Sequence, residues 1–178
     1  GLPPVVLDEG AGTAAAQEHA NDMARLGYLG HWGSDGSVPE ERHTRHGGAD
    51  MILENALCYT DEAVRTLDSA ATFDSAYLEK AEGLFFNEVP PNDGHRKNIL
   101  TRYHTRVGIG IAQPVATPTE IPVACIVQEF LDGYGTYAAI PSRATVGSTI
   151  RVEGTLSKGA HVGGVGVARI PAAAPLAP

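Results

Sequence analysis

Two histidines and two glutamates are the side chains of this sequence best placed to do chemistry. His31 and His95 each lie in a segment marked by glycine, next to the expected end of a helix, where binding and catalytic groups often occur. Glu54 lies among apolar residues in the stretch MILENAL, where a carboxylate needs a hydrogen-bond partner or a cation. Glu88 continues the apolar stripe of an expected helix and has the same need. This pattern suggests that the four side chains converge on one cleft.

Two chemical interpretations fit such a set. The imidazoles of His31 and His95 are potential ligands of Zn²⁺ or another divalent cation, and a carboxylate beside the cation would polarise bound water. Alternatively, the four side chains form a polar network that orders the surrounding loops without a cation. The sequence has no HExxH, GxSxG or GxxxxGK[ST] motif, and no serine or cysteine lies beside a histidine in a recognisable nucleophile motif. The enzyme classes behind those motifs therefore lose support.

The other histidines have simpler interpretations. His43 and His46 lie one helical turn apart, a spacing that can chelate a metal, but a solvent-facing pair is the better expectation on the charged stretch EERHTRH. His19 is expected to be solvated on the surface of a helix. His104 and His161 have no obvious partner in the sequence.

Helices in the first half and strands in the second must position these side chains. The patterns predict helices over residues 13–26, 39–46, 61–72 and 75–88, and then a short helical turn from residue 93 or 94. Alternation over 105–113 and the apolar run over 123–131 predict an antiparallel pair of strands, the second buried on both faces. Helices before such a sheet indicate a layered fold in which they cover it.

The hydrophobic pattern of the sequence changes after residue 135. Residues 136–170 lack helical periodicity and alternate like strands over 149–154 and 161–170, which predicts a short β appendage. Two or three strands are only marginally stable by themselves. This appendage should therefore dock on the main domain or belong to a larger domain. Residues 171–178 form a Pro/Ala tail. The expected organisation is a main domain over 1–135, the appendage and the tail.

The amino-acid composition excludes several classes of protein. The chain has 178 residues, 43% of them hydrophobic and 19% charged, which is an ordinary globular balance that favours one main domain. Its net charge of −8, without a basic cluster, makes nucleic acid an unfavourable partner. No run approaches 18 consecutive apolar residues, so no transmembrane helix is expected. A start at Gly-Leu-Pro-Pro, without methionine, reads as a processed end.

The two cysteines leave a choice open. Cys58 and Cys125 form one disulfide if the compartment is oxidising, or pack as two buried thiols if it is not.

The order of several segments resembles the CAP superfamily, which comprises cysteine-rich secretory proteins, antigen 5 and pathogenesis-related proteins. The segments are AAAQEHANDMARLGYLGH, GSDGSVPEER, ILENA, NEVPPNDGHRKNIL, RVGIGIA and CIVQEF. The bacterial SCP-like extracellular branch is the most similar, and the resemblance covers roughly residues 1–135. It implies an α+β fold, a three-layer α-β-α sandwich with a mostly antiparallel central sheet. This sequence is expected to start after the helix with which the family usually begins, either because that helix was trimmed or because the N-terminus is remodelled. The sequence given also lacks the Cys-rich module of eukaryotic members.

The resemblance also implies a site and a range of functions. The family's cavity tetrad of two histidines and two acidic residues maps onto His31, Glu54, Glu88 and His95. The implied protein is secreted or extracytoplasmic. Its expected function is that of a binding module for a small ligand, lipid, glycan or peptide, with a possible divalent metal such as zinc. The alternative is a metal-dependent, peptidase-like extracellular hydrolase with both histidines as ligands and either glutamate as general base.

Overall fold

The computed structural model describes residues 1–59, 75–112, 124–141 and 143–169. The predicted helix over 61–72 and the Pro/Ala tail over 171–178 lie outside these residues. Within the described part, the elements in chain order are β1 (Val6–Leu7), α1 (Ala11–Leu26), α2 (Pro39–Arg45), β2 (Met51–Tyr59), α3 (Ser75–Phe86), α4 (Gly94–Ile99), β3 (Arg106–Ala112), β4 (Ala124–Asp132), β5 (Gly135–Tyr137) and β6 (Gly154–Leu156).

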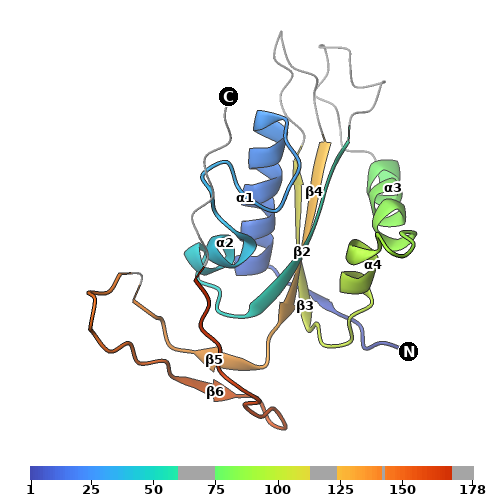
Figure 1. Cartoon of the computed structure of the whole chain (residues 1–178). Coiled ribbons are helices and arrows are strands. Elements are labelled where there is room, and N and C mark those ends of the chain that lie inside the picture. The colour runs from blue at the N-terminus through green and yellow to red at the C-terminus, as the bar shows by residue number, and fades with distance from the viewer. Residues whose placement is uncertain (60–74, 113–123, 142, 170–178) are drawn as a thin grey trace.

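A mixed sheet lies between two layers of helices (Figure 1). Its strand order is β1-β3-β4-β2; β3 and β2 both pair antiparallel with β4, whereas β1 pairs parallel with β3. Helices α1 and α2 cover one face, and α3 and α4 cover the other. The fold is therefore the expected α+β three-layer sandwich with a mostly antiparallel sheet.

Helix α1 lies unusually close to the sheet because both surfaces carry small residues. A Cβ added to Gly110 of β3 would lie 2.1 Å from the carbonyl carbon of Ala16, and one added to Gly108 would lie 2.2 Å from that of Gly12. Such distances are far inside van der Waals contact, so glycine is required at both positions. The buried cluster on this face comprises Ala16, Ala20, Met23, Ala24, Ala56, Ala112, Cys125 and Val127.

The opposite face of the sheet holds a second apolar cluster. Ala81 and Phe85 of α3 pack on Ile126 of β4, with Leu57 and Ile111 beside them. Successive residues of β4 thus point into different layers, as expected for a strand with side chains buried on both faces.

Two predicted helix ends differ from the observed ones. Helix α1 begins at Ala11 rather than Thr13. The Asp8 carboxylate accepts the backbone N–H of Gly12 at 2.8 Å, which satisfies one of the unpaired N–H groups of the first helical turn. Helix α3 ends at Phe86, so Glu88 lies in the following turn and does not continue a helical stripe. The argument that expected Glu88 to be buried on that stripe was wrong.

The strand register brings the two cysteines together. Cys58 of β2 faces Cys125 of β4, with 4.1 Å between their Cα atoms, and the two form a disulfide. The structure thus decides between the two alternatives that the sequence left open.

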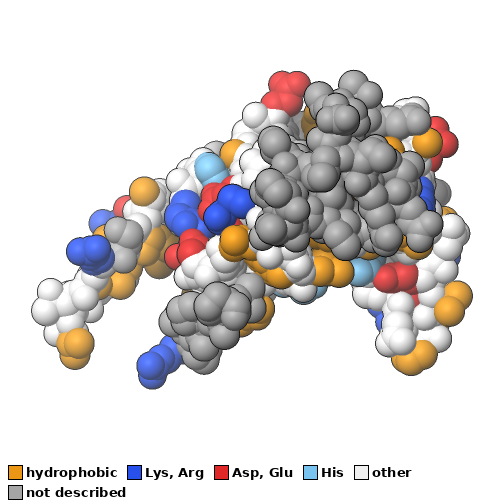
Figure 2. Space-filling view, turned by 90° about the horizontal axis from the view of Figure 1, so that it is seen from above, with side chains coloured by type: hydrophobic (Ala, Val, Ile, Leu, Met, Phe, Trp, Pro, Cys, Tyr) orange, Lys and Arg blue, Asp and Glu red, His pale blue; other side chains and the backbone are white. Residues whose placement is uncertain are grey.

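Beyond β4 the chain forms a limb with a small hairpin of β5 and β6 (Figure 1). In the described residues the strands lie at Gly135–Tyr137 and Gly154–Leu156, not over 149–154 and 161–170 as predicted. Apolar side chains are exposed along this limb, which projects at the left of Figure 2. They are Tyr137, Ile140, Val146, Ile150, Val152, Val162, Val165 and Val167.

Candidate functional site

His31 and Glu54 form the first pair of the candidate site. His31 lies in the loop between α1 and α2, and Glu54 lies on β2 with only 7% of its surface exposed. The imidazole Nδ1 is 2.8 Å from Oε1 of Glu54. This hydrogen bond is the main cause that raises the pKa of His31, against the effect of burial.

Arg42 completes the environment of Glu54. Its guanidinium lies 2.6 Å from Oε2 of Glu54, and both side chains are almost fully buried. It also donates to the carbonyl oxygens of His31 and Ser37, at 3.2 Å and 3.0 Å. Burial opposes ionisation of Glu54, but the hydrogen bond from His31 and the nearby positive charge outweigh it, so the pKa of Glu54 is lowered. Arg42 therefore fixes both the carboxylate and the loop that carries His31.

His19 of α1 is buried beside the same carboxylate, so the prediction that it is solvated was wrong. Its Nε2 donates to the carbonyl oxygen of Gly30 at 2.7 Å and lies 3.7 Å from Oε1 of Glu54. Burial lowers the pKa of His19, which favours the neutral ring. The helical period could have placed it correctly, because His19 lies three and four residues after the buried Ala16 and Ala15.

His95 and Glu88 form the second pair. The imidazole Nδ1 of His95, on α4, is 2.6 Å from Oε1 of Glu88, and the backbone N–H of His95 donates to Oε2 at 2.9 Å. Phe85 packs against the imidazole with ring centroids 4.9 Å apart. Burial works against ionisation of Glu88, but the hydrogen bonds from His95 prevail and lower its pKa.

Two asparagines connect the pairs. Asn98 of α4 donates to the carbonyl oxygen of Glu54 at 3.2 Å and to the side chain of Asn55 at 2.9 Å. The Asn55 amide in turn donates to the carbonyl oxygen of His95 at 3.2 Å. The four predicted residues thus form two His–Glu pairs, which Asn55 and Asn98 link at β2, an edge strand of the described sheet.

The model of the Cysteine-rich secretory protein family, CAP, matches residues 1–129. The chain belongs to the CAP family. A search of curated proteins finds no match.

One solved structure similar to this CAP protein is an extracellular protein containing a SCP domain from Bacillus anthracis str. Ames. The two share 20% sequence identity with a TM-score of 0.48. The alignment covers 73% of this chain and 34% of the other, so the chain spans about a third of the length of that protein.

The two pairs of the CAP domain offer imidazole nitrogens to a cation. In both histidines Nδ1 is held by a carboxylate, and among the described residues neither Nε2 has a hydrogen-bond partner. A carboxylate on one ring nitrogen is the usual support of a metal-ligating histidine. The described residues contain no group of three or more His, Cys, Asp or Glu side chains that could hold a metal ion. Each pair thus offers one imidazole nitrogen of the kind that a divalent cation binds, and the other ligands of such a cation would have to come from water or a bound molecule.

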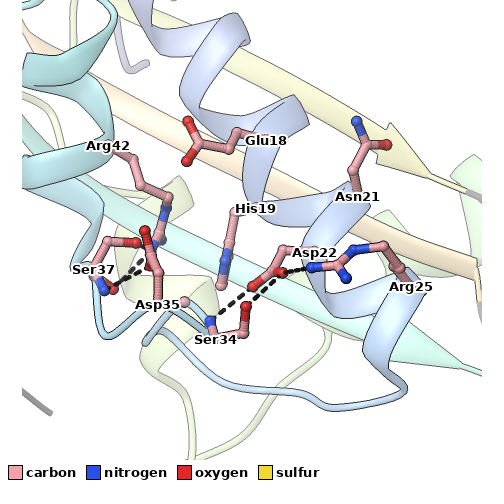
Figure 3. A pocket seen from close by; sticks show the side chains of 10 residues that line it. Glu18, His19, Asn21, Asp22, Arg25, Ser34, Asp35, Ser37 and Arg42 are labelled. Atoms are coloured by element: carbon pink, nitrogen blue, oxygen red, sulfur yellow. Dashed lines mark hydrogen bonds and ion pairs between the residues drawn. The ribbon is translucent and has the colours of Figure 1, made fainter. Parts of the chain in front are cut away.

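A polar cavity of about 390 Å³ lies between α1 and the loop before α2 (Figure 3). It is lined by Glu18, His19, Asn21, Asp22, Arg25, Gly33, Ser34, Asp35, Ser37 and Arg42, and by none of the four predicted site residues. Its charges are largely paired with one another: Arg25 and the Ser34 hydroxyl lie 2.8 Å and 2.7 Å from the Asp22 carboxylate. The cavity thus reaches the site only through His19 and Arg42, the two side chains beside Glu54.

Further polar residues of the CAP domain were missed or misplaced by the sequence patterns. Only His46 of the pair expected to face solvent is exposed; His43 is buried against Gly48, and burial lowers its pKa. His104 is buried and has a partner after all, the Asp132 carboxylate, 2.7 Å from its Nδ1.

Glu129 of β4 is the most unusual residue that was missed. It is fully buried, and neither of its oxygens has a hydrogen-bond donor among the described residues. Burial, the negative charge of Glu54 and a hydrogen bond shared with it raise the pKa of Glu129 to about 10. A lone carboxylate in the apolar run VACIVQEFL was the signal, and the argument used for Glu54 would have found it.

Proposed function

We propose that this CAP domain is a secreted, non-catalytic binding module that holds its ligand, with a divalent cation, at His31 and His95. The supporting observation is that both imidazoles are oriented by a carboxylate at Nδ1 while Nε2 has no partner among the described residues. Their side chains are also accessible, with 55% and 30% of their surfaces exposed. Rings fixed in this way are prepared to bind with little loss of rotamer freedom.

The state of the two glutamates gives the hydrolase alternative less support. A general base needs a free oxygen and a pKa near the working pH. Both oxygens of Glu54 are engaged, by His31 and Arg42, and both oxygens of Glu88 are engaged by His95. The pKa of each carboxyl is lowered, so each would be a weak base. In addition, both cysteines of the chain are in the disulfide, so no free thiol can act as nucleophile.

Zinc is the cation that this donor chemistry suits best, because neutral imidazole is one of its preferred ligands. Such an ion would attract an oxygen atom of the ligand. The charged and amide groups around both pairs favour a glycan or a peptide over a lipid chain as that ligand.

Two observations support an extracytoplasmic location. The matching family is described as secretory, and a disulfide persists in oxidising compartments. Within the described residues, no helix is long and apolar enough to cross a membrane.

Zinc titration into metal-stripped protein, followed by calorimetry, tests the proposal. We expect sub-micromolar binding that is lost in both His31→Ala and His95→Ala and retained in the control His46→Ala, whose exposed imidazole is paired with Glu18. Affinity should fall as the pH decreases through the raised pKa of His31, because a protonated imidazole cannot bind zinc. Zinc binding that is absent, or equal in all three variants, would refute the cation site; glycan and peptide arrays would then test the binding function alone.

A further inference from the structure

Two buried glutamates are direct neighbours on adjacent strands of the sheet. Glu54 of β2 is directly opposite Glu129 of β4 in the antiparallel register. Their exposed fractions are 7% and 0%. Like charges in directly opposed positions destabilise a sheet, and a buried charge without a partner is far more costly. The pair therefore requires an explanation in terms of charge.

The surrounding charges can balance only one carboxylate. Arg42 acts on the pair from α2, but its guanidinium binds Glu54 and two backbone carbonyls rather than Glu129. Glu40, also on α2, adds negative charge, and His19 on α1 donates to a backbone carbonyl. With no donor to either oxygen among the described residues, an ionised Glu129 would lie in this interior without compensation.

We propose that Glu129 is a neutral carboxylic acid at physiological pH and donates its proton in a hydrogen bond to the carboxylate of Glu54. It acts as a positioning residue, because it holds Glu54 from the sheet while Arg42 and His31 hold it from the loop and helix side. The buried cluster then carries one negative charge opposite one guanidinium. Glu129 is too deeply buried to meet the ligand, so the assignment does not depend on what binds at the two His–Glu pairs.

This arrangement has a definite effect on stability. In the unfolded chain a glutamate loses its proton near pH 4.3, whereas folded Glu129 keeps it. Between about pH 4.3 and the higher pKa of folded Glu129, the folded state binds one more proton than the unfolded state. The free energy of unfolding therefore falls as pH rises. The contribution of Glu129 to the unfolding constant increases by up to tenfold for each pH unit between about 5 and 8.

Infrared spectroscopy and pH-dependent unfolding of the whole chain test the inference. The carbonyl stretch of a protonated carboxyl group is separate from the carboxylate bands. We expect this band in the unsubstituted protein at pH 7.5, its loss in Glu129→Gln, and its retention in the control Glu41→Gln, which changes an exposed glutamate. In urea titrations from pH 5 to 8, Glu129→Gln should lose most of the tenfold-per-unit slope, since its amide is neutral and still donates to Glu54.

Three outcomes of the infrared and urea experiments would refute the inference. Absence of the band from the unsubstituted protein, its persistence in Glu129→Gln, or equal slopes for the two proteins would mean that Glu129 does not hold the proton. If Glu129→Gln does not fold, the band of the unsubstituted protein at pH 7.5 decides alone. A failed zinc titration would leave all these readings unchanged, so the two proposals can fail separately.

Discussion

Replacing Arg42 by leucine should destabilise the protein more than any change at its surface. Arg42 is 1% exposed, and the Glu54 carboxylate that it binds at 2.6 Å is buried with it. Removing one partner of such a pair leaves an uncompensated buried charge, which costs about 3–5 kcal/mol. The carbonyl oxygens of His31 and Ser37 lose a donor as well, at about 1 kcal/mol each. Because these losses overlap, we expect a decrease of about 4–6 kcal/mol in the free energy of unfolding.

Urea denaturation followed by circular dichroism measures this loss, and pH identifies its cause. Without Arg42 the folded-state pKa of Glu54 should rise above its unfolded value. The resulting penalty is present above the unfolded pKa and disappears as pH falls below it, so Arg42→Leu should be less harmful at pH 4.5 than at pH 7.5. Adding Glu54→Gln to Arg42→Leu should restore part of the stability at pH 7.5 for the same reason.

The matched control is Arg25→Ala, which removes an ion pair to Asp22 whose arginine side chain is 67% exposed. Such a pair contributes less than about 1 kcal/mol. If Arg42→Leu costs no more than this control, or if Glu54→Gln adds its full cost to it, the assigned role of the buried ion pair is wrong.

Two further predictions concern the disulfide and the close contact between α1 and β3. The disulfide closes a 67-residue separation, so the double variant Cys58→Ser with Cys125→Ser should lose about 4 kcal/mol in chemical denaturation; an unchanged midpoint would show that the bond does not restrain the unfolded chain. Gly110→Ala should cost at least about 2 kcal/mol by calorimetry, because its Cβ meets the backbone of α1, whereas Gly83→Ala in α3, with only ordinary contact, should be neutral or stabilising. Equal melting temperatures for these two alanine variants would contradict the close packing of α1 on β3.

Local patterns accounted for most of the architecture. Alternation in β3 and the apolar run in β4 predicted both strands and their antiparallel pairing. These features could be predicted because helical and strand periods are properties of short stretches of chain.

The sequence pointed to residues of the two His–Glu pairs but not to the side chains that hold those pairs in place. A carboxylate among apolar neighbours and histidines beside glycines pointed to Glu54, His31 and His95. Glu88 was predicted from a helical stripe that the structure does not have, and from the resemblance to the family. The same reasoning missed Arg42 because it lies in the charged stretch EERHTRH, where a solvated face is the natural expectation. A charged helix gives no sign that one of its arginines turns inward, since the reason is a glutamate on another element.

The sequence by itself determined the periods of the helices and strands and supplied the imidazole and carboxylate groups of both pairs. Only the tertiary structure decided how those residues are paired. Glu129 faces Glu54 across 75 positions of chain because the register of β2 on β4 places them opposite, and that register depends on packing against both helical layers. Burial then turns a pair of ordinary glutamates into one carboxylate and one neutral acid, since among the described residues only the guanidinium of Arg42 lies beside them.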